Sequence, residues 1–281
     1  MRCSNRSSAA MCIPRAVMLC ALCFSFLALG KANAAESSPS SCAKPGIQAG
    51  GCVVKNSSQR PVVPEPVELL EKVRATYAAL ESYSDQGTIQ LEEQPPGATM
   101  IRERYSFVTR YEAPRRFYFD FRKGADATAE RFAIWCKGDA FNSWWSATKV
   151  KEQYPPGQGT QAFAMATLPT SGTALLIPPL LFQKAGLQGA LMTMTEPKYG
   201  GTQKLGGRLV HLLTGSVKLN HWNDTVRVTT IWVDAETLMV RKVFEDTPTG
   251  QGEAIQRATT TLDPVPNARL EIAQFDFVPP R

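Results

Sequence analysis

The sequence predicts an α+β protein that is mainly β, with one antiparallel sheet, a helix before it and a short helical insert. Three observations predict this class. Apolar residues recur every three or four positions after Pro64, and apolar and polar residues then alternate over several later segments. An apolar stretch with two adjacent prolines separates two groups of such segments. Spacings of three and four are typical of a helix, and alternation is typical of a strand with one polar face.

The helix is expected over Val67–Tyr83, ending before a turn at Ser84–Asp85. Glutamates at positions 65 and 68 fall in its first turn, where negative charge is favourable. The apolar stripe that would face the sheet consists of Leu70, Val73, Tyr77 and Leu80.

The strands are expected in two groups with polar turns between them. Asp234–Thr237 is predicted to form the hairpin turn between two of the later strands. The clearest expected strands are Ile101–Tyr111, Phe117–Arg122, Arg131–Cys136, Phe141–Ser146, Val226–Asp234, Leu238–Asp246 and Leu270–Val278.

The segment Ser171–Phe182 interrupts the alternation. It is apolar nearly all round and contains Pro178 and Pro179. Because proline fits the first turn of a helix but breaks its interior, we expect two short helical pieces separated at Pro178. A helix that is apolar all round must be covered, and the inner face of the sheet is the surface large enough to cover it.

Aromatic residues gather in the first group of strands, which favours a curved sheet around an apolar interior. Such an interior suits acyl chains, since each buried methylene contributes roughly 0.8 kcal/mol without any polar contact. The predicted cavity residues on the strands are Tyr105, Phe107, Phe117, Phe119, Phe121, Ile134 and Trp144. The predicted lid residues are Leu175, Leu176, Ile177, Leu180, Leu181 and Phe182.

The first 34 residues have the pattern of a secretory signal. Three arginines precede the apolar run Ala16–Gly30, and Ala32–Asn33–Ala34 then supplies a signal-peptidase site, with cleavage expected near Ala34. A single-pass anchor is the alternative, but it needs about 20 apolar residues. Residues 35–64 are rich in Ser, Pro and Gly and are expected to form a flexible tail. Residues 65–281 are then expected to form the folded domain.

Removal of the leader changes both the charge and the cysteine content. The formal net charge of +6 falls to +2, with 27 basic and 25 acidic residues, which does not favour a nucleic-acid surface. Cys42 and Cys52 flank a short loop and could form a disulfide in an oxidising compartment. Cys136 lies in a predicted strand and is expected to be buried and unreactive.

No catalytic or metal-binding pattern stands out. The two histidines, His211 and His221, have no partners at the spacing of metal ligands, and the sequence has no Gly-x-Ser-x-Gly motif. The carboxylates at Asp234 and Glu236 fall in a turn, where solvated side chains are usual. We therefore expect no cofactor, no metal and no enzymatic activity.

The order of these segments resembles the periplasmic lipoprotein-carrier family (LolA/LolB-like), in particular its predicted-periplasmic branch. The resemblance runs from Val67 to Pro280 and rests on weak motifs in a common order. The matching segments are Ser82–Glu93, Arg110–Phe121, Phe132–Trp145, Ser171–Phe182, Thr230–Val243 and Phe275–Pro280.

The resemblance implies an incomplete antiparallel barrel, or half-barrel, with helices over its concave side that holds acyl chains or an apolar partner segment. It also implies the periplasm as the location, and binding rather than catalysis. One position departs from the pattern, because Ala113 stands before Pro114 where the carrier has an arginine that controls lid opening. The resemblance therefore does not extend to the residue that controls the carrier's lid.

Three functions follow, in decreasing order of support. The first is a monomeric carrier whose partner is a lipid or a lipidated protein. The second is an interaction module, such as a stress sensor or assembly factor, that binds a peptide of an envelope membrane protein. The third is an enzyme of unrecognised type, which would need titratable groups converging in the cavity.

Overall fold

A computed structural model describes residues 64–95, 97–124, 129–218, 226–247 and 255–280. The predicted signal peptide, nearly all of the predicted tail, and Cys42 and Cys52 lie outside these residues. Among the helices in these ranges, none is both long enough and apolar enough to cross a membrane.

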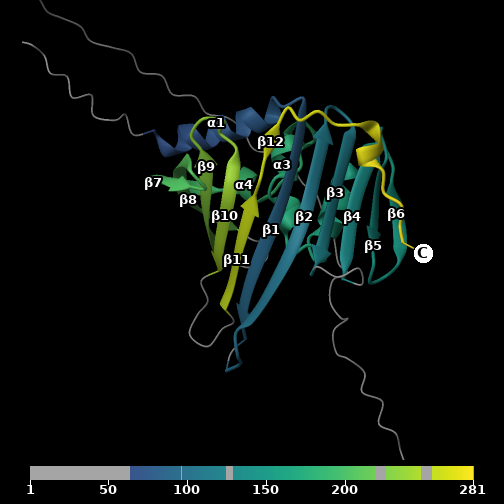
Figure 1. Ribbon diagram of the computed structural model, residues 1–281, viewed down its shortest axis with the longest axis horizontal. Coiled ribbons are helices and arrows are strands. Elements are labelled where there is room, and N and C mark those ends of the chain that lie inside the picture. Colours follow the sequence, from purple (N-terminus) through teal and green to yellow (C-terminus); the bar gives the residue numbers. More distant parts are fainter. Residues whose placement is uncertain (1–63, 96, 125–128, 219–225, 248–254, 281) are drawn as a thin grey trace, which may run out of the picture. The chain divides into compact units, whose positions relative to one another are not determined.

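One antiparallel sheet forms most of the structure, in the order β6-β5-β4-β3-β2-β1-β11-β10-β9-β8-β7, with β12 paired to β1. Strands β6 and β7 form its two edges, so the sheet is open, and the predicted fold class is confirmed (Figure 1). The strands are β1 (Ser82–Gln94), β2 (Ile101–Glu112), β3 (Arg116–Lys123), β4 (Arg131–Lys137), β5 (Phe141–Trp145), β6 (Val150–Tyr154), β7 (Thr195–Leu205), β8 (Arg208–Lys218), β9 (Val226–Asp234), β10 (Val240–Thr247), β11 (Ile255–Leu262) and β12 (Val265–Pro266).

The helices, apart from η3, cover one face of this sheet, which we call the inner face. Figure 1 shows α1 along one end of the strands and α3 and α4 behind them. The helical insert, residues 159–193, contains all the others except η3. The helices are α1 (Pro66–Ala78), α2 (Gly159–Ala166), η1 (Thr173–Leu175), α3 (Pro178–Leu181), η2 (Gln183–Ala185), α4 (Ala190–Thr193) and η3 (Ile272–Phe275).

Helix α1 begins as the sequence predicts. The Glu65 carboxylate accepts hydrogen bonds from the N–H groups of Val67 (2.7 Å) and Glu68 (3.2 Å), and Pro66 occupies the first turn. The predicted end at Tyr83 is wrong, because the helix ends at Ala78 and β1 begins at Ser82. Burial in β1 alternates from Tyr83 onwards, which requires an extended backbone there.

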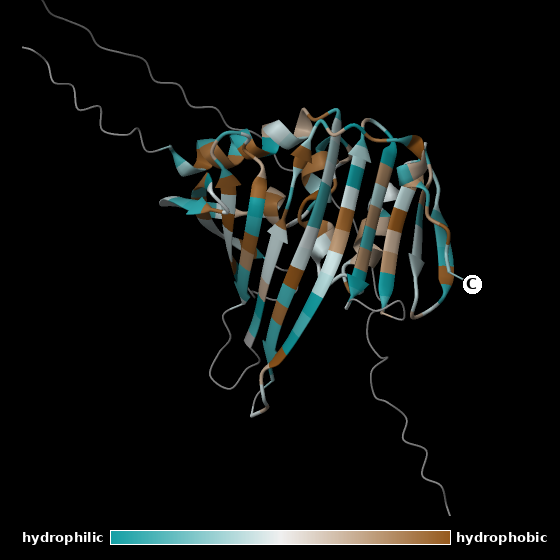
Figure 2. Cartoon of the chain, in the orientation of Figure 1, coloured by the Kyte–Doolittle hydropathy of each residue, from teal (hydrophilic) through white to brown (hydrophobic). Residues whose placement is uncertain are grey.

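Alternation along the strands separates two clusters of buried side chains. The inner cluster lies between the sheet and the helices and includes Phe117, Phe119 and Phe121 of β3. The intervening residues of β3 belong to the opposite, outer face. Figure 2 shows hydrophobic and hydrophilic residues alternating along the strands. The outer cluster consists of Tyr118, Ala133, Trp135, Trp144, Phe275 and Phe277.

The segment after β12 crosses the outer face as a strap. The predicted strand Leu270–Val278 is wrong, since this segment contains η3 and then runs without strand pairing. Phe275 and Phe277 insert into the outer cluster, and Arg131 packs its guanidinium 4.7 Å from the Phe277 ring centre. Burying two phenylalanines stabilises this arrangement by roughly 1.5–3 kcal/mol each.

Candidate ligand-binding site

The structure brings the predicted cavity and lid residues together, with one exception. The strand residues and the middle of the lid are buried in the inner cluster, while Leu175 and Phe182 are half-buried at its border. The two helical pieces separated before Pro178 are present as η1 and α3, as expected. The residues of the inner cluster that were predicted are Tyr105, Phe107, Phe117, Phe119, Phe121, Ile134, Leu176, Ile177, Leu180 and Leu181.

Trp144 is the exception, and its predicted position is wrong. It pairs with Ala133 of β4 and belongs to the outer cluster, under the strap. Its neighbour Trp145 pairs with Phe132 and packs against the inner cluster instead. Two adjacent tryptophans must face opposite sides of a strand, and the sequence alone does not tell which one faces inward.

The interior that these residues form is filled by their own side chains. Phe117 and Phe119 are completely buried. The ring centres of Tyr105 and Phe121 lie 5.3 Å apart, and those of Phe107 and Phe119 lie 6.0 Å apart. Distances of this size are those of aromatic rings in direct contact. The middle of the inner face is therefore a packed core, and a ligand would have to bind at its border or displace part of it.

An apolar cavity of about 260 Å³ lies at that border, where the start of β5 meets α2 and η2. We call it the edge cavity. Its apolar wall is formed by Phe141, Phe163, Phe182 and Leu187. The ring centres of the three phenylalanines lie 5.6–5.7 Å from one another. The ring centre of Phe117, in the inner cluster, lies 5.2 Å from that of Phe182. The edge cavity is thus an opening onto the aromatic part of the inner cluster.

Polar residues surround the mouth of the edge cavity. Asp139 and Thr160 contribute to its lining, and the Asp139 carboxylate forms an ion pair with Arg115. Gly159 lets the first turn of α2 approach the wall, since a Cβ at this position would lie 2.6 Å from Cδ2 of Phe141.

Sequence reasoning missed most of the wall. Only Phe182 was assigned to the site, because Phe163 belongs to α2, which was not predicted. A signal was present, since Ala162, Phe163 and Ala166 have helical spacing and are buried. The helix is only eight residues long and has no side-chain N-cap, so its pattern is weak.

The helical insert is attached to α1 by a small number of polar contacts. The Gln183 side-chain amide donates to the carbonyl groups of Arg74 (2.7 Å) and Leu180 (2.8 Å). The Arg74 guanidinium donates in turn to the Leu191 carbonyl at 2.9 Å. Apolar packing against the inner cluster accounts for most of the remaining attachment.

A buried polar group lies in the inner cluster beside α1. The Asp85 carboxylate accepts hydrogen bonds from the Tyr83 hydroxyl (2.8 Å) and the Thr109 N–H (3.1 Å). Burial raises the pKa of Asp85 to about 6, although these hydrogen bonds oppose the rise. The predicted turn at Ser84–Asp85 is wrong, because both residues belong to β1.

The expected solvated position of Asp234 is also wrong. Its side chain is only 2% exposed and lies within 3.1 Å of Arg241 and 3.4 Å of Arg208. The carboxylate also accepts the N–H groups of Glu236 and Thr237, which closes the predicted hairpin turn. Asp234 is thus part of the turn's structure. Across the described ranges, no three His, Cys, Asp or Glu side chains gather as metal ligands would.

No protein-family model and no curated protein matches the sequence. Among solved structures, the chain is similar to lipoprotein LppX from Mycobacterium tuberculosis, at 14% identity and a TM-score of 0.39, covering 74% of this chain and 100% of that one. It is similar to MucB in complex with MucA from Pseudomonas aeruginosa, at 13% identity and a TM-score of 0.40, covering 75% and 60%.

A LolA superfamily protein from Nitrosomonas europaea is also similar, at 10% identity and a TM-score of 0.30, covering 76% of this chain and 99% of that one. This is the superfamily that the order of the sequence segments resembles. In these three matches at most 14% of the residues are identical, and no TM-score exceeds 0.40.

Proposed function

We propose that the protein binds one acyl chain of a lipid or a lipidated protein in the edge cavity, and that it acts in the periplasm. The observation that carries this proposal is the edge cavity itself, with its wall of three phenylalanines and one leucine. An alkyl chain has no hydrogen-bonding groups, so it can be buried against an apolar wall of this kind without leaving any polar group unpaired. The leader pattern in residues 1–34 supports the location.

The volume of the edge cavity sets the length of chain that fits. A methylene takes up about the volume of a water molecule, roughly 30 Å³, so the cavity accommodates on the order of eight methylenes. At roughly 0.8 kcal/mol each, their burial contributes on the order of 6 kcal/mol before the cost of association is subtracted. We therefore expect weak binding of one chain of medium length.

The polar mouth fits the other end of such a ligand. Asp139 and Thr160 line the cavity and are exposed, and Asp139 is paired with the exposed Arg115, so a lipid head group beside them would remain in water. A longer chain can enter further only if the helical insert moves, because the core behind Phe182 is filled. The hydrogen bonds from Gln183 to the Arg74 carbonyl and from Arg74 to the Leu191 carbonyl are the polar contacts that such a movement would break.

Displacement of a fluorescent fatty acid by unlabelled acids of increasing length tests the proposal. Affinity should rise with each added carbon up to a length of about eight to ten carbons and then level off. Ala185→Phe should weaken binding, since Ala185 is exposed at the cavity and a larger side chain would fill it. Ala164→Phe is the matched control, because Ala164 is also exposed but is not among the residues that line the cavity.

The same binding experiment, with Ala185→Phe and Ala164→Phe compared, can also contradict the proposal that the edge cavity binds an acyl chain. Equal weakening by Ala185→Phe and Ala164→Phe, or no uptake of any acid by the unaltered protein, would exclude the edge cavity as the binding site. Continued gain in affinity to sixteen carbons, with Ala185→Phe still defective, would mean that the insert opens for longer chains.

A second candidate function is the binding of a partner's extended peptide. Strand β6 forms an edge of the sheet, and its last residue, Tyr154, pairs with Phe141 of the cavity wall. A peptide added to β6 would place a side chain near the edge cavity. Val150→Pro, which blocks pairing at an exposed edge position, should abolish peptide binding and leave fatty-acid uptake unchanged.

A further inference from the structure

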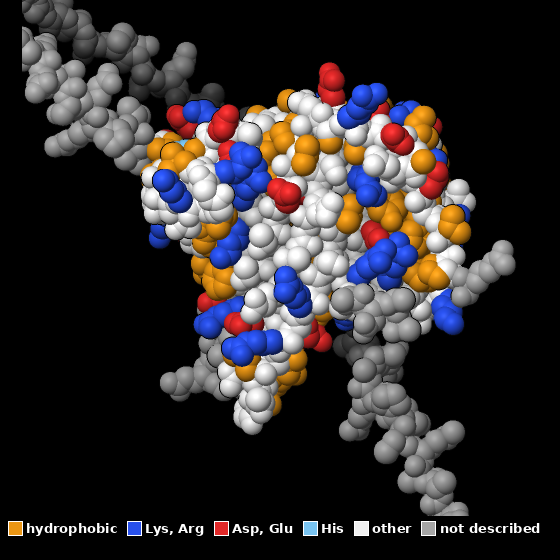
Figure 3. Space-filling view, in the orientation of Figure 1, with side chains coloured by type: hydrophobic (Ala, Val, Ile, Leu, Met, Phe, Trp, Pro, Cys, Tyr) orange, Lys and Arg blue, Asp and Glu red, His pale blue; other side chains and the backbone are white. Residues whose placement is uncertain are grey.

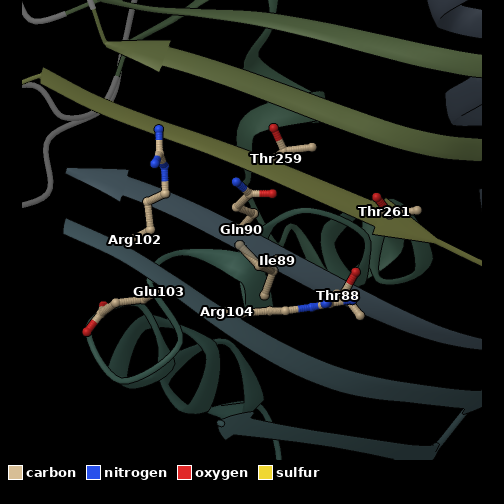
Figure 4. Close-up of a pocket in the computed structure, with 8 residues that line it drawn as sticks. All are labelled: Thr88, Ile89, Gln90, Arg102, Glu103, Arg104, Thr259 and Thr261. Atoms are coloured by element: carbon tan, nitrogen blue, oxygen red, sulfur yellow. The ribbon is translucent and has the colours of Figure 1, made fainter. Parts of the chain in front are cut away.

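The outer face of the sheet contains a second and larger cavity, of about 400 Å³. We call it the outer groove. It lies over β11, β1 and β2, and its walls are formed by Thr88, Gln90, Arg102, Arg104, Thr259 and Thr261 (Figure 4). Strand pairing places Thr88 beside Thr261, and Gln90 between Thr259 and Arg104. Hydroxyl, amide and guanidinium groups are therefore held side by side.

The outer groove is separate from the edge cavity. Ile89 and Glu103 complete its lining, but their side chains belong to the inner face, since Ile89 is in the inner cluster and Glu103 accepts a hydrogen bond from the Tyr105 hydroxyl. Alternation along a strand leaves their backbone as the floor of the groove. Figure 4 shows the Glu103 carboxylate pointing away from the other lining groups.

The charge of the outer groove is not balanced. Arg102 is paired with Glu92 at 3.0 Å, and Arg257, just beyond the groove, is paired with Asp246 at 3.2 Å. Arg104 is exposed and forms no ion pair with any residue that the structure describes. Its side chain extends over β1 towards Thr88 (Figure 4). Figure 3 shows the surrounding outer face, where backbone and uncharged polar side chains predominate and single Lys, Arg, Asp and Glu side chains stand among them.

We propose that the outer groove binds a polar ligand through a phosphate or carboxylate group held by Arg104. A guanidinium presents a planar set of donors that matches the oxygen atoms of such an anion. Thr88, Thr259 and Thr261 supply hydroxyl donors from the opposite wall. The volume of the outer groove, about 400 Å³, exceeds that of a bare anion and falls within the range of roughly 300–1,000 Å³ for small-molecule sites. The anion is therefore carried on a polar group such as a glycerol or a sugar.

Titration of the purified protein with sn-glycerol 3-phosphate, followed by amide NMR, tests this proposal. The amide signals of Thr88, Gln90, Thr259 and Thr261 should shift together and saturate. Arg104→Gln should weaken binding about tenfold or more, because it removes a charge-assisted contact. Arg257→Gln removes the same charge outside the groove and should weaken binding by less than about threefold, through the general field alone. Thr261→Val keeps every charge and should weaken binding about threefold.

Sedimentation with vesicles distinguishes the two sources of a phosphate ester. Binding to vesicles of phosphatidylglycerol, lost in Arg104→Gln and kept in Arg257→Gln, would identify a lipid head group. Binding of glycerol phosphate alone would identify a soluble ligand. Absence of binding in both experiments, or equal weakening by Arg104→Gln and Arg257→Gln, would overturn the proposal. Acyl-chain uptake by the edge cavity is measured separately and does not affect these outcomes.

Discussion

Asp85 makes the stability of the protein depend on pH in an unusual direction. The carboxyl is 1% exposed, has no basic side chain as a hydrogen-bond partner among the described residues, and has its pKa raised from 3.8 to about 6 by burial. Between these two values the folded protein keeps the proton while the unfolded chain has lost it. Folding therefore takes up a proton, and stability from this group decreases as the pH rises from about 4 to about 6.

The size of the effect follows from the two pKa values. A difference of about two pH units corresponds to roughly 3 kcal/mol, since one unit is equivalent to about 1.4 kcal/mol. Asp85→Asn keeps the shape of the side chain and cannot ionise. Its amide oxygen can still accept from the Thr109 N–H, and its NH₂ group can donate to the Tyr83 hydroxyl. We expect the free energy of unfolding of the variant, relative to the unaltered protein, to rise by up to roughly 3 kcal/mol between pH 4 and pH 8.

Urea unfolding followed by tryptophan fluorescence, repeated at intervals from pH 4 to pH 8, measures this difference. Leu213→Ala is the control, since it removes a completely buried apolar side chain and no titratable group, so its difference from the unaltered protein should be nearly constant across the same range. If the difference between Asp85→Asn and the unaltered protein is the same at every pH, the carboxyl does not titrate in the folded state as argued.

Two further predictions concern the hairpin turn and the strap. The pKa of Asp234 is lowered from its usual value. Burial alone would raise this pKa, but the hydrogen bonds from the Thr237 and Glu236 N–H groups and from the Arg241 guanidinium lower it by more than burial raises it. The contribution of this carboxylate to stability is therefore complete at neutral pH and is lost as the pH falls through the folded-state pKa. Asp234→Asn should lower the free energy of unfolding by about 3 kcal/mol at pH 7 and by progressively less in acid. The same series of urea unfolding experiments measures this difference. Phe275→Ala should lower the free energy of unfolding by roughly 3–5 kcal/mol, because the ring is completely buried; a loss under about 1 kcal/mol in thermal unfolding would show that the strap is not part of the folded core.

Short-range patterns were enough to predict the start of α1, the break in the helical insert and several of the strands. Pro66 after Glu65 marks the start of α1, and Pro178 marks the break in the insert, because both effects depend on the proline and its immediate neighbours. Alternation in β3 and β4 correctly assigned Phe117 and Ile134 to the inner face, since a strand with one covered face must alternate.

Features that depend on distant partners were not predictable in the same way. Tyr83 fits the stripe of the preceding helix equally well, and its place in β1 is decided by packing beside Tyr77, with ring centres 5.6 Å apart. Phe275 and Phe277 alternate like strand residues, but they insert into a cluster more than a hundred residues earlier in the chain. The edge cavity arises where the filling of the inner cluster stops, which is a property of side-chain volumes in three dimensions.

The position of β1 in the middle of the sheet has a consequence for the order of folding. Strands β1 to β6 form one run of neighbouring hairpins and β7 to β11 form another. In the described sheet the two runs join where β1 pairs with β11, from Gly87–Leu262 to Gln94–Ile255, and where β12 adds to β1. Such long-range pairing carries a large loop-closure entropy and tends to form late. Until then β1 presents an unpaired edge to other chains, so misassembly during folding should concentrate at this seam.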